Sequence, residues 1–176
     1  MATIRMLNSE ETLSALPDLC DILSDCVNGD ASVGLMLPFT DREATAFWQK
    51  VAKSVGNGDT IHVAAEMDGK IVGTVQVGLA DKPNQPHRGD LMKLLVHRRA
   101  RGLGLSRKLT ERAEAEAVAK GRTLLVLDTA TGSEAEAIYP RLGWQHVGII
   151  PDYALFPDGR YCDTTIFYKR IGQVGS

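Results

Sequence analysis

The chain has 176 residues, of which 44% are hydrophobic and 24% are charged, a composition typical of one globular domain and not of a disordered or fibrous chain. Lys and Arg total 20 and Asp and Glu total 22, so the formal net charge is −2, without the overall basic field that binds nucleic acid. The N-terminal segment lacks the apolar core of a signal peptide, and no run approaches the roughly 20 apolar residues that span a bilayer. We therefore expect neither nucleic acid nor a membrane as a partner.

The cysteines and histidines predict neither a disulfide framework nor a metal site. Cys20, Cys26 and Cys162 are an odd number and form no C-x-x-C pair, which fits a reducing cytoplasm. The histidines lack metal-ligand spacing and are expected on the surface or in the core: His62, His87, His97 and His146.

The first third of the chain predicts a strand followed by two helices. An apolar stretch over 3–7 predicts the strand, and Ser9 is expected to cap the first helix. Apolar residues over 13–27 recur at helical spacing and predict one helix. Thr40 is expected to cap a second helix, which the glycine-rich segment 56–58 ends.

The middle of the chain is β-rich. Segments 60–66 and 71–79 are rich in β-branched residues, and the Asp68-Gly69 pair between them predicts a hairpin. A loop with two prolines covers 82–87. The strand predicted over 89–96 ends in three consecutive apolar residues, so we expect it at the centre of a sheet.

Alternating strands and helices follow this central strand. A basic, glycine-containing turn over 97–104 leads into a helix expected over 101–120, with apolar residues at every fourth position. Segment 123–128 predicts an apolar strand, and 133–142 predicts a second, short helix.

Two late strands complete the prediction. The first, over 144–150, is broken by Pro151-Asp152, and the second covers 164–170. The predicted order is therefore β-α-α-β-β-β-α-β-α-β-β, a mixed α/β (α+β) fold. No linker or repeat interrupts it, so we predict one domain over 1–176.

The turn over 97–104 has the features of a phosphate-binding site. Glycines at 102 and 104 let the main chain approach a ligand, and the helix N-terminus adds a partial positive charge. Arg101 and Arg107 reinforce this charge. The patterns of a Rossmann fingerprint and of a P-loop are both absent. From the residues alone, a tight turn with solvated arginines remains an alternative.

The turn reads Arg101-x-x-Gly104-x-Ser106, which resembles the acyl-CoA-binding motif R/Q-x-x-G-x-G/A of the GNAT (GCN5-related) N-acetyltransferases. The resemblance implies a mostly antiparallel twisted sheet, splayed between the fourth and fifth strands and flanked by four helices. It also implies that the turn amides bind the pyrophosphate of acetyl-CoA, while the preceding strand pairs with the pantetheine arm. The residues so implicated are Leu94, Leu95, Val96, Arg101, Gly102, Leu103, Gly104, Leu105, Ser106 and Arg107.

Shorter segments resemble the tabtoxin-resistance type of GNAT enzyme: GDASVGLM over 29–36, LDTATGSEAEAIY over 127–139 and PDGR over 157–160. This closer resemblance implies a small amino-acid-like acceptor, such as a β-lactam toxin, and a role in resistance.

Two residues depart from the family pattern. Ser106 stands where Gly or Ala is usual, and Gly132 replaces an asparagine that commonly precedes the catalytic tyrosine.

Acetyl transfer from a thioester to an amine needs a neutral amine and a proton for the departing thiolate. The resemblance assigns the proton donor to Tyr139, in the stretch YPRLGW. An ordinary half-buried tyrosine with a bonded hydroxyl is the alternative.

Two carboxylates are candidates for the base or for an anchor of the amine. Asp90 lies near the start of one central strand and Asp128 ends the next. Because these strands run parallel and then splay in the family fold, both are expected to face one cavity. An exposed acid at Asp90 and a turn-capping role at Asp128 remain alternatives. By analogy with the family, Ser32, Met36 and Trp48 are expected near the acceptor.

These features predict an acetyl-CoA-dependent N-acetyltransferase that acts by direct attack of a small amine in a ternary complex, with no metal. Acetylation of a polyamine, an aminoglycoside or a peptide N-terminus is the alternative among enzymes. A non-catalytic acyl-CoA-binding regulatory module is the alternative of another class. The resemblance also implies a homodimer formed through the late strands.

Overall fold

The computed structural model describes residues 1–172, so the last residues of the predicted domain, 173–176, lie outside the described part. Seven strands form one sheet: β1 (Thr3–Met6), β2 (Thr60–Met67), β3 (Lys70–Leu79), β4 (Arg88–Val96), β5 (Leu124–Ala130), β6 (Gln145–Leu155) and β7 (Tyr161–Arg170). The α-helices of the described residues are α1 (Ser9–Ser14), α2 (Leu16–Asn28), α3 (Asp41–Gly56) and α4 (Leu105–Ala119).

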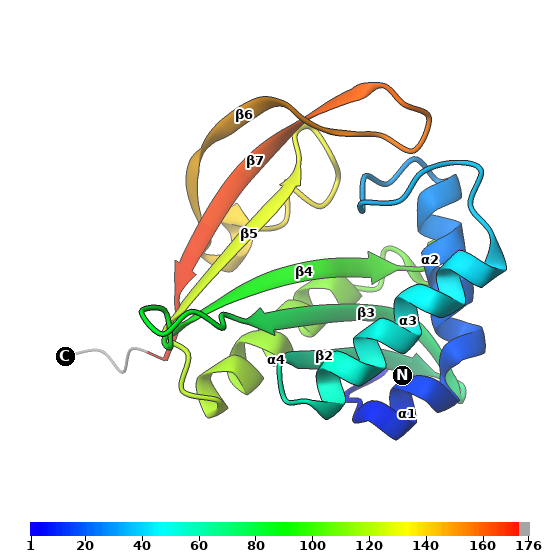
Figure 1. Cartoon of the computed structure of the whole chain (residues 1–176), viewed down its shortest axis with the longest axis horizontal. Helices are drawn as coiled ribbons and strands as arrows, with labels where there is room; N and C mark the ends of the chain where they lie inside the picture. The colour runs from blue at the N-terminus through cyan, green and yellow to red at the C-terminus, as the bar shows by residue number, and fades with distance from the viewer. Residues whose placement is uncertain (173–176) are drawn as a thin grey trace.

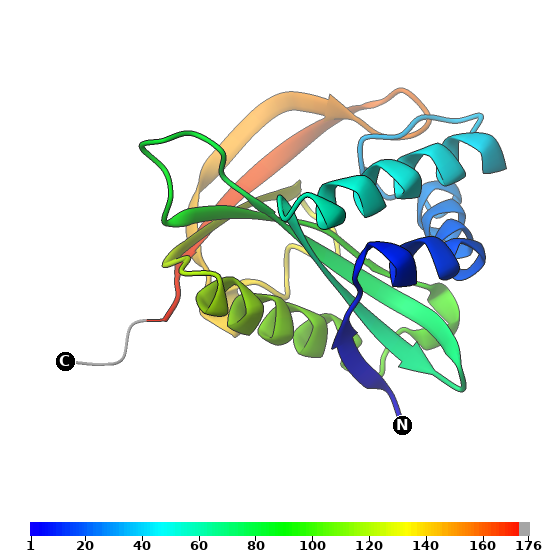
Figure 2. The ribbon, with the colours of Figure 1, turned by 60° about the horizontal axis from the view of Figure 1, so that its bottom comes forward.

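Helices cover both faces of the sheet, whose strand order is β1-β2-β3-β4-β5-β7-β6. Helices α1, α2 and α3 lie on one face and α4 on the other (Figures 1 and 2). Side chains of β2 alternate between the two cores, because Val63 packs on the α4 side and Ala64 on the α2–α3 side. All neighbouring strands are antiparallel except β4 and β5. The predicted mixed, mostly antiparallel fold is confirmed.

The hairpin and the central strand form as predicted. Asp68 and Gly69 both have positive φ, at 51° and 73°, as a two-residue turn that matches the strand twist requires. Strand β4 lies in the middle of the sheet. Helix α4 buries the apolar face that recurs at every fourth residue: Leu105, Leu109, Ala113 and Ala117.

The first helix differs from the prediction at both its start and its middle. Asn8, not Ser9, is the N-cap, and it forms a capping box with Glu11. The expected single helix is divided at Ala15 into α1 and α2. Pro17 explains the division, because proline is accommodated in the first turn of a helix and not in its interior.

The predicted helix over 133–142 is wrong. This segment consists of turns and ends in a single 3₁₀ turn, Pro140–Leu142. Pro140 lacks an amide hydrogen, so it cannot donate the main-chain bond of a helix interior, and the ten-residue segment has too few such bonds to be stable as a helix. The break predicted at Pro151-Asp152 is present as an irregularity in the pairing of β6 with β7 between Ile150 and Ala154, but the strand itself continues to Leu155.

Strands β4 and β5 part after a short parallel pairing. They pair from Arg88 with Leu124 to Asp90 with Val126, and then diverge (Figure 1). The rest of β4, Leu91–Val96, therefore turns its β5-facing backbone edge toward open space. The predicted splay between the fourth and fifth strands is confirmed.

A bulge interrupts β4 just beyond this point. Its register with β3 shifts so that Met92 faces Gln76 and Leu95 faces Thr74, which gives β4 one extra residue. Lys93, within the bulge, has φ of 53°. A left-handed conformation at a lysine costs about 1–2 kcal/mol, so the surrounding structure must hold it in place.

His62 is the centre of a buried polar network under α3. Its Nδ1 lies 3.0 Å from the Thr12 hydroxyl and its Nε2 lies 2.7 Å from the Thr74 hydroxyl. The Thr12 hydroxyl already donates to the Asn8 carbonyl, so it accepts from Nδ1–H, and Nε2 accepts from Thr74. Trp48, which is fully buried, stacks on the imidazole at a centroid distance of 5.5 Å. Each nitrogen of the neutral imidazole therefore has a hydrogen-bond partner.

Burial lowers the pKa of His62 from 6.5 to about 4, and this predicts a loss of stability in acid. As the pH falls below 6.5, the unfolded chain takes up a proton at this residue that the folded protein takes up only near pH 4. The free energy of unfolding should therefore decrease by roughly 3 kcal/mol across that window. Urea unfolding at several pH values measures it. In His62→Gln this pH-dependent contribution should vanish. The control His87→Gln, at an exposed residue, should retain it. The same dependence of the free energy of unfolding on pH in both variants would contradict the assignment to His62.

Candidate active site

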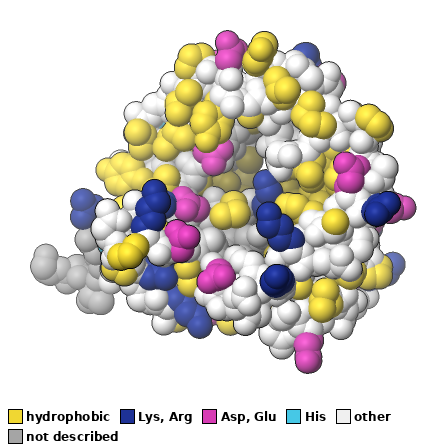
Figure 3. Space-filling model, in the orientation of Figure 1, with side chains coloured by type: hydrophobic (Ala, Val, Ile, Leu, Met, Phe, Trp, Pro, Cys, Tyr) yellow, Lys and Arg dark blue, Asp and Glu magenta, His cyan; other side chains and the backbone are white. Residues whose placement is uncertain are grey.

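A cavity of about 1060 Å³ lies where β4 and β5 separate. Its walls come from the end of α2 and the loop after it, the second half of β4, the start of α4, the end of β5 and the β6–β7 hairpin. Figure 3 shows this hollow between the layer of β5, β7 and β6 and the rest of the molecule. The splay of the sheet thus creates this cavity.

The glycine turn opens into this cavity. Gly102 and Gly104 have φ of 77° and 69°, a region that strongly favours glycine. Gly104 is the N-cap of α4, and no side chain of the described residues caps the helix. The first backbone bond of α4 runs from the Lys108 amide to Gly104, so the amides of 105–107 are left for a ligand. This is the geometry of an anion site.

Nine of the ten residues expected to bind acetyl-CoA line the cavity: Leu94, Leu95, Val96, Arg101, Gly102, Gly104, Leu105, Ser106 and Arg107. The tenth residue, Leu103, is implicated through the amides of the turn. Its side chain is 52% exposed and lies outside the cavity lining. Because it lies between two glycines of left-handed backbone, the turn directs this side chain away from the space that its neighbours border.

Ion pairs connect the start of the glycine turn to helix α2. Arg98 bonds to Asp25 through both its amide and its guanidinium, and Arg99 donates to Asp21 at 2.8 Å. Burial acts to raise the pKa of Asp25, but the hydrogen bonds from Arg98 outweigh this and hold the pKa below its usual value. His97 lies 3.4 Å from Asp21 and joins the same cluster. The glycine turn is therefore held in a fixed position.

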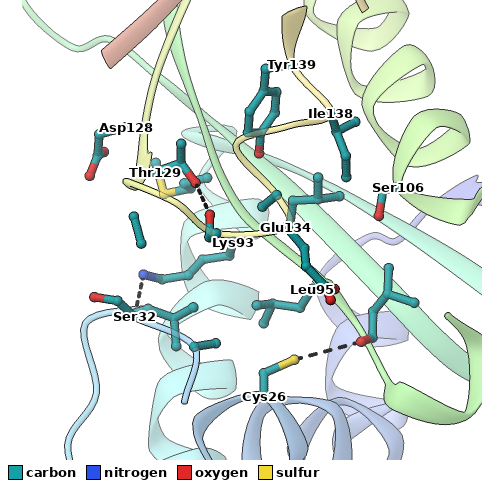
Figure 4. A pocket seen from close by; sticks show the side chains of 18 of the residues that line it. Cys26, Ser32, Lys93, Leu95, Ser106, Asp128, Thr129, Glu134, Ile138 and Tyr139 are labelled. Atoms are coloured by element: carbon teal, nitrogen blue, oxygen red, sulfur yellow. Dashed lines mark hydrogen bonds between the residues drawn. The ribbon is translucent and has the colours of Figure 1, made fainter. Parts of the chain in front are cut away.

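Tyr139 lies on the wall opposite this turn and points its hydroxyl into the cavity (Figure 4). The side chain is 4% exposed, and its ring packs against Trp144 and Phe167 at centroid distances of 5.8 and 5.7 Å. Within residues 1–172 no hydrogen bond holds the hydroxyl. Burial and the charge of Asp128 raise the pKa of Tyr139 well above 10, so the phenol stays protonated at neutral pH.

The two expected carboxylates do not lie together. Asp128 is exposed at the end of β5 and lines the cavity. Asp90 lies where β4 and β5 are still paired, outside the cavity, and its carboxylate accepts a hydrogen bond from Arg88 at 2.6 Å. The separation follows from the splay, because the cavity opens only after Asp90. The sequence could place both residues on adjacent strands but not locate the point of divergence.

Of the residues expected near the acceptor, the structure brings Ser32 to the cavity. Its hydroxyl donates to the Leu155 carbonyl at 3.1 Å. Met36 is 42% exposed and lies outside the lining, on the far part of the loop. Trp48 is fully buried against His62, so it packs in the core and cannot contact an acceptor. The structure thus brings neither Met36 nor Trp48 to the lining of the cavity.

Sequence reasoning missed Lys93, which lines the cavity on the same side as Asp128 (Figure 4). Its Nζ donates to the Val33 carbonyl at 2.6 Å. A charged residue in the middle of a strand expected at the centre of the sheet was the available signal. The cavity also includes two cysteines, Cys26 and Cys162, which are free thiols.

Two further observations concern residues 1–172 alone. They contain no group of three or more His, Cys, Asp or Glu side chains placed to hold a metal ion. None of their helices combines the length and the apolar character needed to cross a bilayer.

Solved structures share this fold over nearly the whole chain. An N-acetyltransferase from Staphylococcus aureus Mu50 aligns with a TM-score of 0.79 and 22% identity, covering 97% of this chain and 98% of its own. A ribosomal-protein-alanine N-acetyltransferase from Brucella melitensis gives 0.78 and 22%, covering 96% and 99%. A phosphinothricin acetyltransferase from Sinorhizobium meliloti, in complex with acetyl-CoA, gives 0.80 and 18%, covering 97% and 89%.

The sequence itself identifies the family. Residues 17–144 match the model of the acetyltransferase (GNAT) family, a segment that includes the first cavity-lining helix, the glycine turn and Tyr139. The match covers well over half of the chain, and the splayed sheet and the glycine turn agree with it. The chain therefore belongs to the acetyltransferase (GNAT) family.

Proposed function

We propose that the protein is an acetyl-CoA-dependent N-acetyltransferase whose acceptor is the amino group of a small amino-acid-like compound. One observation carries the proposal: a single cavity contains both the unpaired amides at the start of α4 and the buried, protonated Tyr139. The first feature suits the pyrophosphate of a coenzyme A thioester. The second suits proton delivery to its sulfur.

The cavity fits acetyl-CoA as a substrate. The turn over 101–107 supplies amides and the two arginines for the phosphates. The unpaired edge of β4 leaves Leu94 and Leu95 to hydrogen-bond an extended pantetheine arm through their main chain. That arm would run from the turn toward Tyr139.

The reaction follows from these positions. The neutral amine attacks the thioester carbonyl, so the new C–N bond forms as the C–S bond breaks. Tyr139 protonates the departing thiolate, and the amine loses its proton to Asp128 or through water. The products are the N-acetylated acceptor and coenzyme A with a free thiol. Asp128 also attracts the ammonium form of the acceptor before it loses its proton.

Direct attack is supported by the state of the Cys26 thiol. Burial raises the pKa of the Cys26 thiol, with the charge of Asp25 acting in the same direction. Cys26 is therefore protonated at neutral pH and is a weak nucleophile for an acetyl-enzyme intermediate. The proposal retains a ternary complex of enzyme, acetyl-CoA and amine.

The resemblance to tabtoxin-resistance enzymes supports a β-lactam amino acid as one acceptor and a role in resistance. The S. meliloti structure, a phosphinothricin acetyltransferase, shares the fold. A cytoplasmic location accompanies this proposal, and the three free thiols are consistent with a reducing compartment.

The exposed face of β6 supports a homodimer. Strand β6 is at the edge of the sheet, and Val147, Ile149 and Tyr161 are 61%, 51% and 71% exposed in this region. Hydrophobic side chains also gather over this edge in Figure 3. Such a surface is typical of an interface between protein chains.

Light scattering after size exclusion tests the dimer. The wild type is expected at twice the chain mass, and Val147→Lys together with Ile149→Lys is expected at the mass of one chain, because buried lysines are strongly unfavourable. Val118→Lys replaces an exposed apolar residue on α4 and serves as the control. A wild type that elutes as a monomer at high concentration would exclude the proposed dimer.

Calorimetric titration with acetyl-CoA, followed by an assay of thiol release, tests the proposed activity. The acceptor panel contains amino acids, β-lactam amino acids, polyamines, aminoglycosides and a peptide N-terminus. Binding with release for small amino acids supports the proposal, and release only with polycations or peptides would reassign the acceptor. Tight binding with no release for any acceptor would favour a regulatory acyl-CoA-binding module.

A further inference from the structure

We propose that Lys93 binds a carboxylate of the acceptor, so that the enzyme selects amines that carry a nearby carboxylate and holds them between Lys93 and Asp128. The inference rests on the proposed function and deepens it. In this view the Lys93 side chain determines which acceptor is selected.

The bulge in β4 brings Lys93 to the cavity wall. The extra residue and the positive φ of 53° interrupt the regular alternation of side chains at this point. Its ammonium group then lies in the cavity, 2.6 Å from the Val33 carbonyl. Strained residues of this kind persist where the surrounding structure holds them, and they are concentrated at functional sites.

The ammonium group retains capacity for a ligand. It has three N–H donors, and the contact with Val33 uses one of them. Among the described residues it forms no ion pair with a carboxylate. Burial lowers the pKa of Lys93 and the charge of Asp128 acts in the opposite direction, so a bound carboxylate would further favour the charged form.

Lys93 and Asp128 lie at the acceptor end of the cavity, away from the phosphate-binding turn. In Figure 4 both are on one side of Tyr139, and Ser106 at the start of α4 is on the other. Arg101 and Arg107 already serve the coenzyme end. A second cation that faces Asp128 is therefore placed to bind a negative group of the acceptor, while Asp128 attracts its amine.

The segment 30–37, here called the strap, is bonded to the β6–β7 hairpin beside the acceptor end. Asp30 bonds to Arg160 at 2.7 Å, Ser32 to the Leu155 carbonyl at 3.1 Å, and the Leu37 amide to the Pro157 carbonyl at 2.9 Å. Figure 1 shows this segment beside the tip of the β6–β7 hairpin. The strap forms one wall of the acceptor end, and Lys93 repels the additional positive charge of a polyamine.

The test compares amino acids with their uncharged amides as acceptors. In the wild type, kcat/KM for the acids should exceed that for the amides by about 10- to 100-fold, the effect of one hydrogen bond to a charged group. Lys93→Met should remove this preference by raising KM for the acids, with little change for the amides or in acetyl-CoA affinity. Lys93→Asn is a second variant, because asparagine tolerates a left-handed backbone. Lys82→Met removes the same charge from an exposed loop outside the cavity and should behave as the wild type.

Product binding provides a readout that does not need turnover. N-acetyl amino acids, but not their amides, should bind the complex of wild-type protein with coenzyme A, and both Lys93 variants should lose this difference. A preference that persists in folded Lys93 variants, or acids that neither react nor bind, would overturn the inference. Turnover of polyamines alone would overturn it while leaving the acetyltransferase proposal intact. Binding of acids without turnover of any acceptor would support the role of Lys93 and contradict the proposed activity.

Discussion

Tyr139→Phe is expected to lower kcat for acetyl transfer by about 10²- to 10⁴-fold, the usual contribution of a positioned acid, and to leave the affinity for acetyl-CoA nearly unchanged. The hydroxyl points into the cavity and forms no hydrogen bond to the described residues, so its loss leaves no buried partner unsatisfied. The ring contacts with Trp144 and Phe167 remain in the variant. The protein should therefore fold and bind its substrate normally.

Steady-state assays of thiol release and calorimetry with acetyl-CoA measure the two effects separately. Tyr168→Phe is the matched control, because Tyr168 lies on β7 outside the cavity and is 36% exposed. A variant at 139 with full activity would show that another group or water protonates the thiolate. Loss of acetyl-CoA binding in that variant would instead indicate a structural role for the hydroxyl.

The sequence predicted those elements whose signal is local. The β2–β3 hairpin depends on two adjacent residues, Asp68 and Gly69, that tolerate positive φ, and the structure confirms it. Helix α4 depends on a four-residue repeat of apolar side chains. The short helix expected over 133–142 is a series of turns instead, because a ten-residue segment with a proline at position 140 has few main-chain hydrogen bonds to offset the cost of starting a helix.

The candidate site was predictable only in part, because it depends on where two strands diverge. The glycine turn and Tyr139 were recognisable from the sequence motifs, and both line the cavity. Asp90 and Asp128 read alike as acids on neighbouring strands, yet only Asp128 lies beyond the end of the β4–β5 pairing. Lys93 was missed because its position depends on a bulge, and a bulge leaves no reliable mark on the hydrophobic pattern.

Ser106→Asp is expected to weaken acetyl-CoA binding by about 100-fold without destabilising the fold. Ser106 lies in the first turn of α4 and lines the cavity, where the pyrophosphate is proposed to bind. A carboxylate there repels the phosphates by about 3 kcal/mol at the effective dielectric of a partly buried site, which corresponds to that change in affinity. The same charge interacts favourably with the helix N-terminus, so the melting temperature should be unchanged or slightly higher. The affinity for acetyl-CoA should thus fall without any loss of stability.

Two variants separate the effect of charge from that of shape. Ser106→Ala restores one of the residues usual at this position in the family and should bind acetyl-CoA within a few-fold of the wild type. Gln49→Glu adds one negative charge on the exposed face of α3, outside the cavity, and should bind normally if the repulsion is local. Equal affinity for acetyl-CoA in Ser106→Asp and the wild type would mean that the phosphates bind elsewhere. In that case the unpaired amides of α4 would not bind the pyrophosphate, and the proposed function would lose its main support.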